Sequence, residues 1–162
     1  MIKKFAIALA LTAGLAGPAL AQEVIRHTNP GSNFPIARAV EVPAGMTTVY
    51  LSGAVPSVVD PAADRATTAA YGDMETQTVS VLNSIEKTLA DLDLTMGDVI
   101  KMQAFLVAPE GTKLDFEGFM KGYTQFFGTA EQPNLPSRSV MTVAGLVSPG
   151  WLVEIEVTAV RP

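Results

Sequence analysis

An arginine and two glutamates near the C-terminus are the side chains whose types and spacing best suit chemistry. Arg138 stands at the start of a predicted strand, and Glu154 and Glu156 alternate along the next one, so both carboxylates face the same way. A guanidinium can bind a carboxylate through two parallel hydrogen bonds. A carboxylate beside it could orient and deprotonate a water molecule. The same residues could instead form a structural salt bridge between subunits, with Arg138 paired to Glu154 or Glu156, and spacing alone favours that alternative.

The rest of the composition excludes several other kinds of active site. The chain has no cysteine, so disulfides, cysteine nucleophiles and thiolate metal sites are ruled out. Its single histidine, His27, lies near the N-terminus in a segment that we expect to be a flexible arm. This composition leaves little material for a histidine-dependent triad or a zinc site.

The N-terminus has the pattern of a secretory signal peptide. Lys3 and Lys4 precede an apolar run, and a small-x-small cleavage motif ends at Ala21. The apolar run has about 12 residues, whereas a membrane-spanning helix needs about 20. We therefore predict that residues 1–21 are removed, and that the domain 22–162 is periplasmic or secreted with no membrane attachment.

Charge gives an expectation about partners. Removal of the predicted signal would take away two lysines and leave 9 basic and 16 acidic residues, a net charge of about −7. No cluster of Lys and Arg is present to neutralise phosphates. We therefore expect no nucleic-acid partner.

The hydrophobic pattern predicts one α+β domain in the order β-β-α-β-α-β-β. The expected strands are 37–42, 47–51, 99–107, 138–144 and 151–160, and the expected helices are 73–92 and 114–127. Residues 22–35 and 54–72 are expected to be irregular, and the aromatic stripe of the second helix is expected to be core. Two helices can cover only one face of a five-stranded sheet, so another subunit is expected to cover the other face.

Several segments, in this order along the chain, closely resemble the RidA (YjgF-like) family. They are Leu51-Ser52-Gly53, Gly97-Asp98-Val99-Ile100-Lys101, Pro136-Ser137-Arg138-Ser139 and Val153-Glu154-Ile155-Glu156-Val157. The resemblance covers residues 35–161, and ordered matches across a whole domain are more specific than one short motif. It implies a chorismate-mutase-like subunit that assembles as a homotrimer, with sites in the clefts between subunits.

The resemblance also implies a reaction. Proteins of this family hydrolyse reactive enamine and imine acids, such as 2-aminoacrylate and its tautomer 2-iminopropanoate, to a 2-keto acid and ammonia without a metal or cofactor. Arg138 matches the arginine that holds the substrate carboxylate, and Glu154 matches the glutamate that positions the attacking water. Ser52 and Gly53 match the turn that borders the pocket.

Three positions depart from the pattern of the family. Ile36 stands in place of a pocket tyrosine, Met120 in place of an asparagine, and Val140 in place of a small residue or cysteine. These changes make the predicted pocket more apolar, so that with Phe34 it could accept a bulkier apolar substrate. The alternative function is a trimer in the periplasm that binds or sequesters a small carboxylate without turnover.

Overall fold

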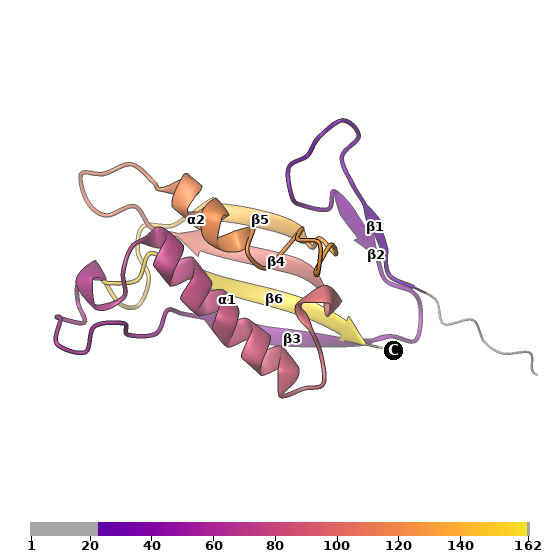
Figure 1. Ribbon diagram of the computed structural model, residues 1–162, viewed down its shortest axis with the longest axis horizontal. Helices are drawn as coiled ribbons and strands as arrows, with labels where there is room; N and C mark the ends of the chain where they lie inside the picture. Colours follow the sequence, from indigo (N-terminus) through magenta and orange to yellow (C-terminus); the bar gives the residue numbers. More distant parts are fainter. Residues whose placement is uncertain (1–22, 162) are drawn as a thin grey trace, which may run out of the picture.

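A four-stranded mixed sheet with two helices packed on one face forms the body of the protein (Figure 1). The computed structural model describes residues 23–161, so the predicted signal peptide lies outside the described residues. The strands are β1 (Ile25–His27), β2 (Ala39–Glu41), β3 (Thr47–Ala54), β4 (Val99–Leu106), β5 (Ser137–Thr142) and β6 (Val153–Arg161). The helices are α1 (Met74–Ala90) and α2 (Phe116–Tyr123), with short 3-10 turns at Thr68–Ala70 and Met96–Asp98. The α+β fold class is confirmed.

The order of strands in the main sheet is β3-β6-β4-β5. Strands β4 and β5 run parallel, whereas β6 is antiparallel to both of its neighbours. Strand β4 therefore lies between the strand that carries Arg138 and the strand that carries Glu154.

One of the five strands predicted for the sheet belongs elsewhere. Strand β2 pairs with β1 in a separate hairpin, and within the 37–42 segment only Ala37 forms a bridge to the main sheet, opposite Ser137. The prediction of an irregular N-terminal arm was wrong, because residues 25–27 form strand β1 and pair with β2. His27 lies in β1, and its Nε2 is 2.7 Å from Oε1 of Glu41 on β2.

Both helices begin at an aspartate whose side chain caps the first turn. Asp73 accepts a hydrogen bond from the amide of Thr76, and Asp115 accepts one from the amide of Gly118, each at 2.8 Å. Helix α2 is shorter than predicted because its helical bonding ends at the Tyr123–Thr124 cap, and turns follow. Among the described residues, neither helix has the length and apolarity needed to cross a membrane.

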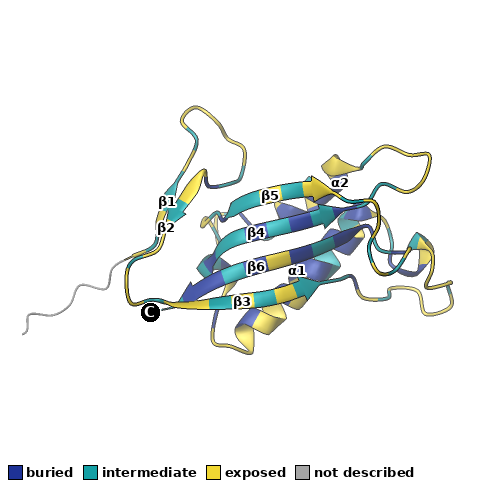
Figure 2. Cartoon of the chain, turned by 180° about the vertical axis from the view of Figure 1, so that it is seen from behind, coloured by how far each residue is buried: buried dark blue, intermediate teal, exposed yellow. Residues whose placement is uncertain are grey.

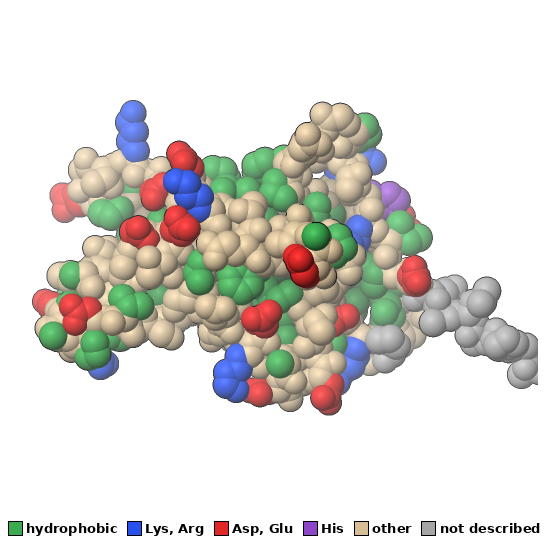
Figure 3. Space-filling model, viewed as in Figure 1, with side chains coloured by type: hydrophobic (Ala, Val, Ile, Leu, Met, Phe, Trp, Pro, Cys, Tyr) green, Lys and Arg blue, Asp and Glu red, His purple; other side chains and the backbone are tan. Residues whose placement is uncertain are grey.

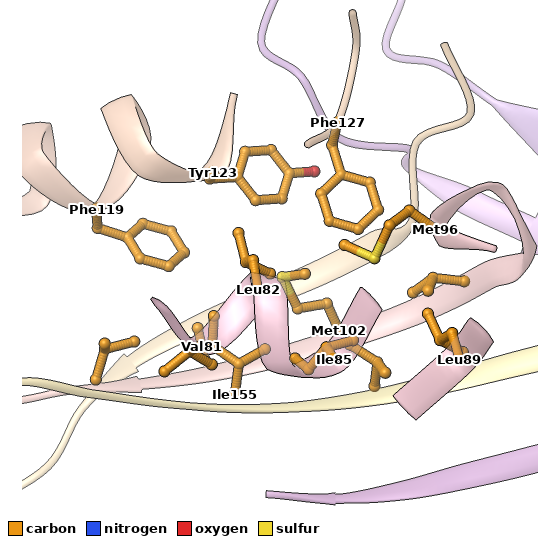
Figure 4. Close-up of a cluster of buried hydrophobic side chains, with 14 of the residues drawn as sticks. Val81, Leu82, Ile85, Leu89, Met96, Met102, Phe119, Tyr123, Phe127 and Ile155 are labelled. Atoms are coloured by element: carbon orange, nitrogen blue, oxygen red, sulfur yellow. The ribbon is translucent and has the colours of Figure 1, made fainter. Parts of the chain in front are cut away.

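The core lies between the two helices and the sheet (Figure 4). The rings of Phe119, Tyr123 and Phe127 are fully buried and stacked in sequence, with centroids 6.1 Å and 5.0 Å apart. They stand over Leu82 and Met102, so the expectation that this aromatic stripe is core is confirmed.

Strand β6 shows the predicted alternation. Val153, Ile155 and Val157 are buried toward the helices, while Glu154 and Glu156 are more exposed on the other face. No element of the described chain covers that second face of the sheet, as the view from behind shows (Figure 2). We refer to it below as the open face.

A single buried glutamine joins the start of α1 to the chain entering β6. The side-chain amide of Gln77 donates to the carbonyls of Gly72 and Gly150, at 2.9 and 3.0 Å, and its oxygen accepts from the amide of Leu152 at 2.7 Å. The side chain is fully buried. It therefore satisfies three backbone groups, and its bonds to Gly150 and Leu152 are buried.

Replacing Gln77 by Leu should destabilise the protein by about 3 kcal/mol, because several buried backbone groups would lose their partners at a cost of roughly 1–3 kcal/mol each. Denaturant unfolding at one fixed protein concentration measures this change. The matched control is Gln125→Leu, an exposed glutamine on the surface, which should change stability by less than about 0.5 kcal/mol. Equal effects of the two substitutions would contradict the role given to Gln77.

Candidate functional site

Arg138 is enclosed by aromatic rings on the helix side of the sheet. It is the second residue of β5 and pairs with Met102 of β4, so it points toward α2 as Met102 does. Its guanidinium carbon lies 4.0 Å from the ring centroid of Tyr123, 5.3 Å from that of Phe119 and 5.5 Å from that of Phe34. These distances allow cation–π attraction on three sides.

Residues 23–161 do not fill the hydrogen-bonding capacity of Arg138. Its Nη2 contacts the sulfur of Met120 at 3.3 Å, while its Nη1 is buried with no hydrogen-bond partner. Burial lowers the pKa of Arg138, and the neighbouring Tyr123 opposes that effect, but an arginine stays charged in either case. A buried cationic donor without a partner is costly. An incoming anion, such as a carboxylate, would relieve that cost.

Glu154 and Glu156 lie on the open face, away from Arg138. They pair with Phe105 and Gln103 of β4, whereas Arg138 pairs with Met102, and neighbouring positions on a strand face opposite sides. Arg138 therefore forms no ion pair with either glutamate of its own chain, and the alternative of a salt bridge between subunits stays a prediction. The sheet separates Arg138 from Glu154 within one copy, so the predicted shared site would need two subunits, and it stays a prediction.

Three of the predicted site residues, Ser52, Gly53 and Glu154, lie close together on β3 and β6. Leu51 faces Val157 and Ala54 faces Ile155, so β3 contains one extra residue, a β-bulge, between them. At this bulge the Glu154 carboxylate occupies the place that a Cβ on Gly53 would take, so a larger residue at position 53 would displace the carboxylate. Exposed Ser52 precedes it. We call Ser52, Gly53 and Glu154 the glutamate half-site.

The glutamate half-site adjoins a hollow on the open face. This cavity has a volume of about 350 Å³. Its polar lining is formed by Ser52, Lys101, Gln103, Glu156 and Thr158, together with the phenol of Tyr50. Tyr50 is 80% exposed, so the hollow is open to whatever covers this face.

The three predicted apolar positions gather on the other side, with Arg138. Val140 follows Arg138 by two residues on the same strand face, and Met120 supplies the sulfur contact. Ile36 lies beside the start of β5, because the amide of the next residue, Ala37, donates to the Pro136 carbonyl at 3.0 Å. We call the surroundings of the guanidinium the arginine half-site; its side chains are Phe34, Ile36, Phe119, Met120, Tyr123, Arg138 and Val140.

The roles of Phe119 and Tyr123 in this half-site were missed. The sequence pattern assigned them to the core, and they are core, but the guanidinium of Arg138 also lies over both of their rings. Their spacing of four residues puts them on one helix face, and a lone arginine at the start of the following strand is the signal that could have connected them. Tyr123 further donates its hydroxyl to the carbonyl of Pro35 at 2.8 Å.

The buried phenol of Tyr123 is held in its neutral form. Burial raises its pKa to about 12, against a smaller opposing effect from the charge of Arg138. Tyr123 can therefore donate a hydrogen bond at neutral pH but does not act as a base. Within residues 23–161, no group of three or more acidic or histidine side chains is placed to hold a metal ion.

Comparison with known proteins settles the family. The family described as Endoribonuclease L-PSP, to which the YjgF and RidA proteins belong, matches residues 24–161, nearly the whole chain. The protein is a member of this family. The resemblance predicted from the sequence is thereby confirmed at the level of the family.

Several solved structures resemble the chain over most of its length. TdcF of E. coli, determined with bound serine, is 27% identical with a TM-score of 0.56, and the match covers 87% of this chain and 99% of TdcF. An uncharacterised protein of Pseudomonas aeruginosa is 25% identical with a TM-score of 0.55, covering 86% of this chain and 100% of that one. The Rid-family protein YyfB of Yersinia pestis, at 23% identity and a TM-score of 0.62 over 84% of this chain and 98% of its own, shows the shared fold. Comparison with curated proteins gave no match.

The ionisation of Tyr123 gives a prediction that needs no ligand. In a spectrophotometric titration, the difference between the wild type and Tyr123→Phe should be a tyrosinate signal with a midpoint near pH 12, because burial disfavours the charged phenolate. Since the folded pKa is raised above its usual value, the contribution of this group to stability is intact below about pH 10 and falls as the pH rises toward about 12. A difference signal centred at pH 10 would contradict the burial of this phenol beside Arg138.

Proposed function

We propose that the protein is a hydrolase that converts 2-imino acids, or their enamine tautomers, to 2-keto acids and ammonia in a cleft between two copies of the chain. The observation that carries the proposal is the buried Nη1 of Arg138, which has no partner in an otherwise aromatic pocket. Family membership supports a function of this general kind. The serine bound to TdcF supports a ligand with a carboxylate and a nitrogen on the adjacent carbon.

The proposed cleft needs two copies because the two half-sites lie on opposite faces of one sheet. A neighbouring copy that lays its open face against the β5 side of the first would bring its Glu154 toward the first copy's Arg138. Repetition of this contact around a threefold axis closes into a homotrimer. It would also cover the open face, which no element of the described chain covers.

The chemistry follows from the charges of the two half-sites. The substrate carboxylate binds the Arg138 guanidinium, which fixes the adjacent imine carbon in the cleft. Glu154 of the neighbouring copy accepts a proton from a water molecule, whose oxygen attacks that carbon and opens the C=N bond. Glu154 passes that proton to the nitrogen, which gives a carbinolamine. Glu154 then transfers the hydroxyl proton of this intermediate to the nitrogen, so that the C–N bond breaks and ammonia leaves as the carbonyl forms. The aromatic rings around Arg138 exclude bulk water and strengthen the ionic contact.

An RNA substrate is a poorer fit, although the description of the family names an endoribonuclease. The chain is acidic, with a net charge of −5, and Lys and Arg side chains are scattered over the face seen in Figure 3. Phosphate backbones need clustered positive charge. We therefore propose small-molecule partners, with residues 1–21 directing the protein to the periplasm or outside the cell.

The catalytic roles can be tested by following keto-acid release while an amino-acid oxidase generates imines. Arg138→Ala should lower kcat/KM about 100-fold or more, because two charge-assisted hydrogen bonds are lost. Glu154→Gln should lower kcat about 100-fold or more with little change in KM. Arg65→Ala, at an exposed arginine away from both half-sites, serves as control. Full activity of Arg138→Ala would refute the proposal, and binding that depends on Arg138 without any turnover would favour the carboxylate-binding alternative.

A mixing experiment tests whether the two half-sites come from different copies. Equal amounts of Arg138→Ala and Glu154→Gln chains, refolded together, should form clefts at random. About one quarter of the clefts would then combine an intact arginine with an intact glutamate. We expect roughly a quarter of wild-type activity from two nearly inactive parents. No recovery, with assembly verified by light scattering, would show that the site does not lie between copies.

A further inference from the structure

We infer that Phe34 determines which ligands the arginine half-site accepts, and that these are carboxylates with bulky apolar side chains, branched or aromatic. The inference rests on the proposed function, since it assumes that Arg138 holds the carboxylate. It goes further by assigning the ligand class to one residue of the N-terminal hairpin.

The ring of Phe34 contacts the guanidinium of Arg138 and is also partly exposed to solvent. Its ring centroid lies 5.5 Å from the guanidinium carbon of Arg138, yet the residue is 45% exposed. The other two rings of the cage, Phe119 and Tyr123, are fully buried. Phe34 is therefore the one aromatic wall of this half-site with substantial apolar surface left for a ligand to cover. Burying that surface is favourable in proportion to its area.

The loop that carries Phe34 is held from both sides. Tyr123 donates to the carbonyl of the following residue, Pro35, at 2.8 Å. On the other side, the guanidinium of Arg26 on β1 donates to the carbonyl of Gly97 at 2.6 Å and to that of Leu135 at 3.4 Å. The ring is thus positioned before any ligand arrives, which lowers the entropy cost of binding against it.

The remaining lining favours apolar side chains over polar ones. Val140 and Met120 are the neighbours of Arg138 along β5 and on α2, and the hydroxyl of Tyr123 already donates to Pro35. Among the described side chains of this half-site, the free hydrogen-bonding capacity lies mainly on the guanidinium, which the ligand carboxylate would occupy. A hydroxyl or charge farther along the ligand would be desolvated there with little compensation.

Calorimetric titration with three 2-keto acids, the products of the proposed reaction, tests the inference through binding alone. The probes are pyruvate, 4-methyl-2-oxopentanoate and phenylpyruvate. For the wild type we expect the two bulky acids to bind at least about 10-fold more tightly than pyruvate, the discrimination typical of an apolar pocket. Phe34→Ala should reduce that ratio to about threefold or less, mainly by weakening the bulky acids. Phe34→Leu, which keeps apolar volume, should retain the preference for the branched acid.

The control variants separate this inference from the proposed function. Phe116→Ala removes another partly exposed phenylalanine, which stacks on Phe119 at 5.9 Å, and it should keep the wild-type ratio. Arg138→Ala should abolish binding of all three acids. Suppose that Arg138→Ala abolishes binding, but either wild type binds pyruvate as tightly as phenylpyruvate or Phe34→Ala keeps the wild-type ratio. Then Phe34 does not set the ligand class, while the carboxylate site at Arg138 stands. If Arg138→Ala binds all three acids normally, both the inference and the proposed function fall.

Discussion

The alternation of side chains along β6 is the constraint on which the rest of this structure depends. Every second residue from Val153 to Ala159 is apolar and packs under the helices, so the intervening Glu154 and Glu156 must face the other way. Slipping the register by one residue would bury two carboxylates in the core, at a large cost in free energy. The core therefore fixes the glutamate half-site on the open face as firmly as it fixes the fold.

The arginine half-site obeys the opposite constraint. Arg138 on β5 and Met102 on β4 point to the same face of the sheet. Arg138 therefore places a charge on the face that is otherwise apolar and covered by the helices. The stacked rings of α2 and the ring of Phe34 compensate part of the cost of desolvation through cation–π contacts. The unpaired Nη1 remains uncompensated. Such local inconsistency between a residue and its surroundings is typical of functional sites rather than of structural ones.

The sequence was sufficient for most of the elements, whereas the roles of the site residues stay predictions. The spacing of apolar residues in α1 and β6 reports directly on which side is buried, and those elements agree with prediction to within a few residues. It was insufficient for the order of the strands, because β4 enters between β5 and β6 through contacts distant in the sequence. That one insertion decides whether Arg138 and Glu154 are neighbours. The hairpin of β1 and β2 was missed for a similar reason, since three-residue strands carry almost no periodic signal.

The hairpin changes what the N-terminal region does. Arg26 ties it to two carbonyls, one of which, that of Leu135, lies three residues before Arg138. The loop between its two strands places the ring of Phe34 against the guanidinium of Arg138 and the carbonyl of Pro35 at the hydroxyl of Tyr123. The region that follows the predicted signal peptide is therefore one wall of the arginine half-site. The Arg26 guanidinium and the Tyr123 hydroxyl hold this wall through backbone carbonyls, and the Phe34 side chain takes no part in these hydrogen bonds. We therefore expect substitution of Phe34 to change the lining of the half-site more than the fold.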